Sequence, residues 1–189
     1  MVKTTSTMLP LGTPAPDFSL PDTVSGQMLS ERDVAGSQAT LVMFICNHCP
    51  FVKHIVDELA RLGRDYSGPE VGMAAISSND VQGFPQDRPE RMRELAQDMG
   101  FAFPYLYDES QNVARAYGAA CTPDFYVFDG DRRLVYRGQL DDSRPGNGVP
   151  VSGRDIRAAL DALLAGKAVS TDQKPSLGCN IKWKTSGSR

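Results

Sequence analysis

The sequence contains little of what marks a membrane-spanning, nucleic-acid-binding or disulfide-rich protein. Its 189 residues include four cysteines, two histidines and one tryptophan. No stretch approaches the roughly 20 apolar residues that a membrane-spanning helix needs. The 23 acidic and 20 basic residues are interspersed and leave a net charge of −3. No charged block therefore favours a nucleic acid or an anionic membrane as a partner.

The amino terminus also lacks the pattern of a secretory signal peptide. Residues 1–12 contain one lysine and no long apolar run, so we expect a cytoplasmic protein. In a reducing compartment structural disulfides are rare, and closely spaced cysteines are typical of catalysis or metal binding. The four cysteines, Cys46, Cys49, Cys121 and Cys179, are therefore the first residues to consider as functional.

Apolar periodicity predicts alternating strands and helices. Residues 39–45 form an unbroken apolar run, typical of a strand that is covered on both faces. Residues 51–62 place their apolar side chains on one half of a helical wheel. The other predicted elements are a strand at 71–77, helices at 89–99 and 110–117, hairpins pairing 18–20 with 27–29 and 124–128 with 133–137, and a last helix that Ser152 caps and Gly166 ends.

This order of elements favours one α/β domain. A strand–helix–strand unit requires a crossover and parallel pairing, whereas the later hairpin adds antiparallel strands. The simplest architecture is a central mixed β-sheet with helices on both faces, extended by the amino-terminal hairpin. We place this single domain at residues 1–166. Residues 167–189 read as an irregular carboxy-terminal tail packed on the domain.

Cys46 and Cys49 form a CxxC motif where a predicted strand ends and a helix begins. The first amides of a helix lack intrahelical partners and the dipole there is positive, so a thiolate at this point is stabilised. Pro50 fits the first helical turn. We expect Cys46 to be the exposed nucleophile at the helix tip and Cys49 to be a more buried resolving thiol.

His48, between the two cysteines, could stabilise the Cys46 thiolate and make the disulfide more oxidising. A metal site is the alternative interpretation of this motif. Zinc needs four ligands, and the sequence has no second CxxC or HxxxH, although Cys121 or Cys179 could complete a set. Redox chemistry is therefore the favoured interpretation, and no bound cofactor is expected.

Five motifs, in this order and spacing, resemble the thioredoxin-like superfamily and, within it, the peroxiredoxin-like redoxins of AhpC/TSA type. They are GTPAPDF at 12–18, FICNHCPFVK at 44–53, AYG at 116–118, TPDFYVFD at 122–129 and SLGCNIKW at 176–183. The resemblance covers nearly the whole chain and implies a thioredoxin-like fold.

The resemblance also implies roles for residues outside the CxxC motif. Thr122 and Pro123 would form the cis-proline turn that faces the cysteines and pairs with an extended substrate. Cys121 would then lie near Cys46, either as a third redox thiol or as a small buried residue. Cys179 is either an extra resolving thiol or an incidental cysteine. Lys53, at the end of the FICNHCPFVK segment, is a further auxiliary candidate.

The function implied is a thiol–disulfide oxidoreductase that acts on a protein or small-molecule disulfide and is recycled by an external dithiol reductant. A thiol peroxidase is the first alternative. Peroxiredoxins carry a threonine three residues and a proline seven residues before the reactive cysteine, whereas this chain has Met43 and Ala39 there. A metal- or copper-binding protein is the second alternative, although the CxxxC and distant histidine of copper-handling relatives are missing.

Overall fold

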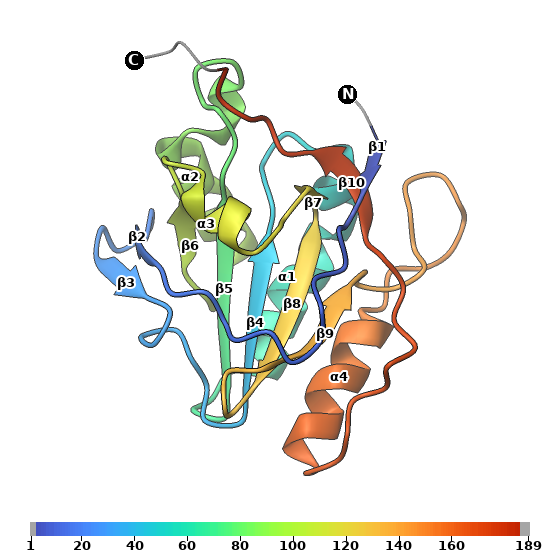
Figure 1. Cartoon of the computed structure of the whole chain (residues 1–189). Helices are drawn as coiled ribbons and strands as arrows, with labels where there is room; N and C mark the ends of the chain where they lie inside the picture. The colour runs from blue at the N-terminus through green and yellow to red at the C-terminus, as the bar shows by residue number, and fades with distance from the viewer. Residues whose placement is uncertain (1–2, 186–189) are drawn as a thin grey trace.

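A five-stranded mixed sheet forms the centre of the computed structural model, which describes residues 3–185 (Figure 1). The strand order is β6-β5-β4-β8-β9. The strands are β4 (Ala39–Phe44), β5 (Val71–Ser77), β6 (Tyr105–Tyr107), β8 (Asp124–Asp129) and β9 (Leu134–Gly138). Strands β4, β5 and β6 are parallel, whereas β8 and β9 run antiparallel to their neighbours. Every residue of β4 is buried, as its apolar run predicts.

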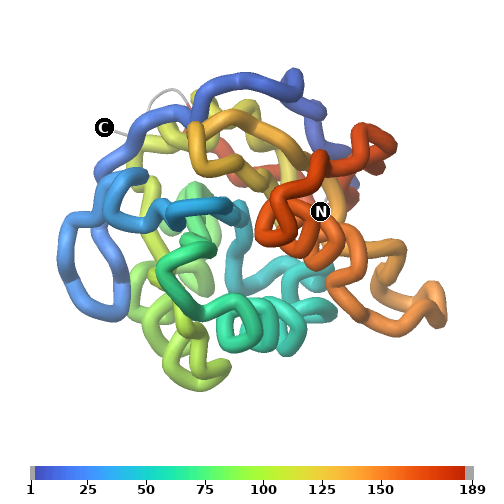
Figure 2. The backbone as a smooth tube through the Cα atoms, turned by 90° about the horizontal axis from the view of Figure 1, so that it is seen from below, coloured from blue at the N-terminus to red at the C-terminus, as the bar shows by residue number. Residues whose placement is uncertain are grey.

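Helices cover both faces of this sheet, as the sequence predicts. One face packs against α1 (Pro50–Asp65), α2 (Pro89–Met99) and α4 (Arg154–Leu164). The other face packs against α3 (Asn112–Ala116) and apolar residues of the amino-terminal segment. Figure 2 shows that segment in blue on the opposite side of the domain from α1 in teal. None of the described helices is long and apolar enough to cross a membrane.

Two predicted helix starts are wrong. The last helix is preceded by Gly153 rather than capped by Ser152. The backbone N–H groups of both residues instead donate to the buried carboxylate of Asp141. The helix expected at 110–117 is confined to α3, with Gln111 as its N-cap residue. Competing hydrogen bonds of this kind are a common reason why sequence patterns misplace helix ends.

The amino-terminal hairpin is confirmed, with β2 (Ser19–Pro21) antiparallel to β3 (Met28–Ser30). The expectation of an irregular tail is wrong for part of residues 167–189. Residues Leu177–Asn180 form β10, which lies between β1 (Lys3–Thr5) and β7 (Cys121–Thr122) in a second sheet (Figure 1). This strand is missed because all its pairing partners are distant in sequence. Residues 1, 2 and 186–189, which the expected boundaries include, lie outside the described residues.

The peptide bond between Thr122 and Pro123 is cis, which confirms the isomer that the resemblance implies. β10 runs directly alongside this turn. A side chain at Gly178 would overlap the carbonyl oxygen of Thr122, so glycine is required for the close approach of the two strands. The hydroxyl of Ser176 donates to the carbonyl of Pro123 at 2.5 Å. The carboxy-terminal strand is therefore fixed against the turn.

Candidate redox site

The two cysteines of the CxxC motif lie where β4 ends and α1 begins. Cys49 is the N-cap residue of α1 and Pro50 follows in the first turn. Cys46 lies three residues earlier, in the turn between strand and helix. Both residues have 0% exposure. The expectation of an exposed Cys46 at the helix tip is therefore wrong, because Cys49 takes the helix terminus and more distant segments cover both residues.

One covering segment is the loop that follows β5. The carboxylate of Asp87, from the short 3-10 helix Pro85–Asp87, accepts the backbone N–H groups of Asn47 and His48 at 2.9 and 3.1 Å. It also accepts the side-chain amide of Asn79 at 2.8 Å. The ring of Phe84 stacks on the His48 ring with centroids 5.0 Å apart. This loop thus holds the CxxC turn by its backbone and shields it from solvent.

His48 faces Asp87 more closely than it faces Cys46. Its Nδ1 lies 2.6 Å from Asp87 Oδ2 and 3.8 Å from Cys46 Sγ. A proton on Nδ1 is therefore donated to the carboxylate. Burial raises the pKa of Asp87, but the hydrogen bonds from the His48 ring, the Asn79 amide and the His48 backbone N–H keep it below its usual range. The hydrogen bond to Asp87 therefore fixes the orientation of the His48 ring.

The Thr122–Pro123 turn faces both cysteines from the other side. The hydroxyl of Thr122 is 3.4 Å from Cys46 Sγ, and its carbonyl oxygen accepts the thiol of Cys49 at 3.2 Å when that thiol is protonated. Both contacts come from one residue, 76 and 73 positions along the chain from the two cysteines. The structure therefore brings Cys46, His48, Cys49, Thr122 and Pro123 together.

The three auxiliary candidates lie in different surroundings. Cys179, on β10, hydrogen-bonds to the sulfur of Cys49 through both its thiol and its backbone N–H. The thiol of Cys121 instead donates to the carbonyl of Pro123 at 3.7 Å. Lys53 is exposed on α1. Of these three residues, Cys179 is the one in contact with the redox pair.

The surroundings of the two sulfurs place the first negative charge on Cys49. The Cys46 thiol donates to Cys49, and together with the Cys179 thiol and the backbone N–H groups of Val52 and Cys179 it lowers the pKa of Cys49 to about 4 against the opposing effect of burial. Donation to Cys49, burial and the negative charge of Asp87 raise the pKa of Cys46 well above its usual range. The reduced pair therefore shares one proton and one negative charge at neutral pH.

This charge predicts the pH dependence of the reduced protein. The thiolate ultraviolet absorbance should persist as the pH falls from 9 and disappear around pH 4. The Cys49 pKa is lower in the folded than in the unfolded chain, so its ionisation stabilises the folded state. This contribution to the free energy of unfolding is complete above the unfolded thiol pKa of roughly 8.5 and is lost as the pH falls through about 4. The Cys49→Ser variant should lack the low-pH transition, whereas a transition near pH 8.5 in the wild type would contradict this assignment.

Three donor atoms of the site could also approach a metal ion. Ligand atoms of Cys46, His48 and Asp87 lie within 4.8 Å of one another. Structural zinc sites use four ligands. In this geometry His48 Nδ1 and Asp87 Oδ2 already share a 2.6 Å hydrogen bond, which a metal ion would have to replace. The donor set therefore fits a hydrogen-bonded redox site better than a metal centre.

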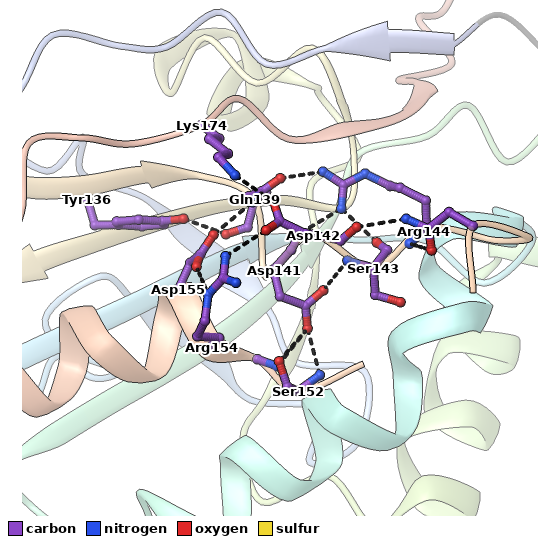
Figure 3. A network of polar contacts seen from close by, with 12 residues as sticks. Tyr136, Gln139, Asp141, Asp142, Ser143, Arg144, Ser152, Arg154, Asp155 and Lys174 are labelled. Carbon is purple, nitrogen blue, oxygen red and sulfur yellow. Dashed lines mark hydrogen bonds and ion pairs between the residues drawn. The ribbon is translucent and has the colours of Figure 1, made fainter. Parts of the chain in front are cut away.

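The loop between β9 and α4 forms a wall beside Pro123. Ser143, Arg144 and His54 line a small hollow together with this proline. A polar network fixes the loop: Asp141 accepts the N–H groups of Ser143 and Ser152, and Arg144 donates to the side chain of Gln139 (Figure 3). His54 Nε2 lies 2.7 Å from the Ser143 hydroxyl and ties α1 to the same loop.

Asp87 and Asn79 are the site residues that the sequence patterns miss. A usable signal exists, because β4 and β5 are parallel neighbours and the carboxyl ends of such strands meet at one edge of the sheet. The CxxC turn follows β4, and the loop carrying Asn79 and Asp87 follows β5. An acidic residue in that second loop is therefore a reasonable candidate partner for the amides of the first.

A mixed sheet with helices on both faces, and a buried dithiol where the central strand meets a helix, define a thioredoxin-like redoxin. The chain belongs to the AhpC/TSA family, which it matches over residues 11–137.

Two solved structures resemble the whole chain. An uncharacterized conserved protein from Geobacillus kaustophilus is 57% identical, with a TM-score of 0.97 and 99% of each chain covered. A hypothetical protein from Sinorhizobium meliloti is 53% identical, with a TM-score of 0.93 over 97% of this chain and 100% of that one. The chain is also 28% identical to the thiol:disulfide interchange protein DsbE of Allochromatium vinosum, over 62% of this chain and 60% of DsbE.

Proposed function

We propose that the protein is a thiol–disulfide oxidoreductase that cycles Cys46 and Cys49 between dithiol and disulfide. The observation that carries this proposal is the hydrogen bond from the Cys46 thiol to the Cys49 sulfur at the start of α1, with Thr122 facing both. The substrate is a protein or small-molecule disulfide, and an external dithiol returns the protein to the reduced state.

The shared proton gives the first step. Cys49 takes the proton of Cys46, and the resulting Cys46 thiolate attacks one sulfur of the substrate disulfide. A Cys46–substrate bond forms, the substrate S–S bond breaks, and the leaving thiolate takes the proton from Cys49. The Cys49 thiolate then attacks Cys46 Sγ, so that the Cys46–Cys49 bond forms and the second substrate thiolate leaves.

The covered site sets a condition on this reaction. Neither cysteine has any exposed surface, so a substrate reaches Cys46 only when the surrounding segments, among them the Asp87 loop, move. In that loop the ring of Phe84 stacks on His48, a residue of the motif itself. A flexible or extended disulfide is therefore a better substrate than one inside a rigid globular surface.

The testing experiment is equilibration of the full chain in glutathione buffers, with the number of thiols counted by mass spectrometry. We expect one Cys46–Cys49 disulfide with a potential less negative than thioredoxin's, about −270 mV, because a stabilised thiolate favours the reduced state. Reduction of insulin by the protein and dithiothreitol is the matching activity measurement. If two thiols are never lost together, the proposal fails.

A thiol peroxidase is the second candidate. The family match favours it. The Thr122 hydroxyl also favours it, because it lies 3.4 Å from Cys46 Sγ and could replace the threonine hydroxyl that peroxiredoxins carry at the position of Met43. In that reaction Cys46 would attack a peroxide oxygen and release the other oxygen as water or an alcohol, and Cys49 would condense with the sulfenic acid to give the disulfide and water. Peroxide consumption faster than that of a free acidic thiol would support this candidate over the first.

A further inference from the structure

We propose that Cys179 is a third redox-active thiol, which takes over the oxidised state by attacking Cys49 and forming a Cys49–Cys179 disulfide. This inference rests on the proposed function, since the Cys46–Cys49 disulfide must form first. It assigns a covalent step to the carboxy-terminal strand, which already packs against the Thr122–Pro123 turn.

The pairing of β10 with β7 brings Cys179 to the active-site pair. Cys179 lies directly opposite Thr122 in the antiparallel register, and the carbonyl oxygen of that same Thr122 lies 3.2 Å from the Cys49 sulfur. The side chains of Cys46, Cys49 and Cys179 belong to one cluster of buried residues, in which Cys179 is 3% exposed. The three cysteines therefore lie in the same buried layer, with Thr122 contacting Cys46 and Cys49 and pairing with Cys179.

Cys49 is the common partner in this layer. The thiol of Cys46 donates to Cys49, and the thiol of Cys179 does the same from the strand side. A sulfur with a thiol neighbour on each side can form a disulfide with either one. Cys121 is also buried nearby, but its thiol donates to the Pro123 carbonyl. The structure thus distinguishes the Cys179 thiol, which contacts Cys49 and can exchange with it, from the Cys121 thiol, which is hydrogen-bonded to another group.

The strand carrying Cys179 is held firmly in place. Gly178 allows its backbone to pass next to the Thr122 carbonyl, and Ser176 donates to the Pro123 carbonyl. On the other side β1 pairs with it, placing Lys3 opposite Cys179. Because the Cys179 thiol already hydrogen-bonds to the sulfur of reduced Cys49, its attack on that sulfur in the disulfide needs no search by a mobile tail.

The exchange balances without an added oxidant. The Cys179 sulfur attacks Cys49 Sγ, the Cys49–Cys179 bond forms, and the Cys46–Cys49 bond breaks. Cys46 leaves as a thiolate and takes up the proton that Cys179 gives up, so the protein remains oxidised by two electrons throughout. Cys46 then carries a thiol again beside Thr122 and His48, while the disulfide joins Cys49 to β10.

The test is disulfide mapping of the oxidised full chain. Wild-type protein is oxidised with diamide, quenched in acid, unfolded, alkylated with N-ethylmaleimide and digested with pepsin at acidic pH. We expect both Cys46–Cys49 and Cys49–Cys179 peptides, with alkylated Cys46 in the same fraction as the second linkage. In the Cys179→Ser variant the second linkage should be lost and Cys46 should be fully protected from alkylation. The matched Cys121→Ser variant should show both linkages.

The possible outcomes separate the two proposals. Wild-type protein that contains Cys46–Cys49 linkages and no Cys49–Cys179 linkage would overturn the exchange and leave the proposed function standing. Absence of a Cys46–Cys49 linkage in both the wild type and Cys179→Ser would overturn the proposed function itself. The wild-type map decides the exchange without any substitution, so poor folding of a variant does not affect the result.

Discussion

Replacing Cys46 with serine should reduce the disulfide reductase activity by at least about 100-fold, because the hydroxyl cannot form the covalent intermediate. The structure gives no other cysteine the same position, since Thr122 Oγ1 contacts the Cys46 sulfur and the Thr122 carbonyl contacts Cys49. Replacing Cys49 with serine should have a different effect. The Cys46–substrate disulfide should accumulate, because the thiol that resolves it is missing.

The measurement is the mass of each variant after exposure to a small disulfide such as oxidised glutathione. We expect Cys49→Ser to gain one glutathione on Cys46, removable by dithiothreitol, and Cys46→Ser to gain none there. The Lys53→Ala variant is a control on the same helix, with an exposed side chain, and should keep wild-type kinetics. An active Cys46→Ser protein, or a Cys49→Ser protein modified at another residue, would show that the roles are misassigned.

The CxxC turn is predictable from sequence because its position depends on local patterns. The apolar run at 39–45 and the amphipathic pattern at 51–62 specify a buried strand followed by a helix, and the turn between them is then fixed. The structure shows β4 and α1 in these places. The chemistry of a dithiol at a helix start follows from these elements and requires no tertiary information.

The burial of the site is not predictable in this way, because it depends on residues distant in the sequence. Asp87 reaches the amide of Asn47 across 40 positions. The backbone N–H of Ser176, next to β10, donates to the Ser6 hydroxyl across 170 positions. No periodicity within β10 indicates these partners, so Cys179 reads as part of a tail until the second sheet is seen. The cis bond at Pro123 was expected from the family resemblance alone.

The second large effect concerns Asp87, whose replacement should both destabilise the protein and uncover Cys46. The carboxylate accepts four hydrogen bonds, from two backbone N–H groups, the His48 ring and the Asn79 amide. Alanine would leave these donors unpaired in a buried site. We expect the free energy of unfolding of the oxidised protein to fall by about 3–5 kcal/mol, measured by urea denaturation.

The same variant should change the chemistry of Cys46 in a way that lost stability does not explain. The negative charge of Asp87 helps to raise the pKa of Cys46, so its removal should shift part of the shared thiolate from Cys49 to Cys46. Loss of the anchored loop should also admit reagents. We expect alkylation of Cys46 by iodoacetamide at neutral pH to become at least about tenfold faster in Asp87→Asn and Asp87→Ala.

Asp108 provides the matched control for this prediction. It is fully buried and accepts hydrogen bonds from Ser78, Ser110 and the backbone of Ala114, none of which belongs to the CxxC turn. Asp108→Ala should therefore lose stability by a comparable mechanism while the alkylation rate of Cys46 stays within about twofold of wild type. If both variants accelerate alkylation equally, general loosening of the fold explains the effect. If only the Asp87 variants do so, the carboxylate controls access to Cys46 and the charge on it.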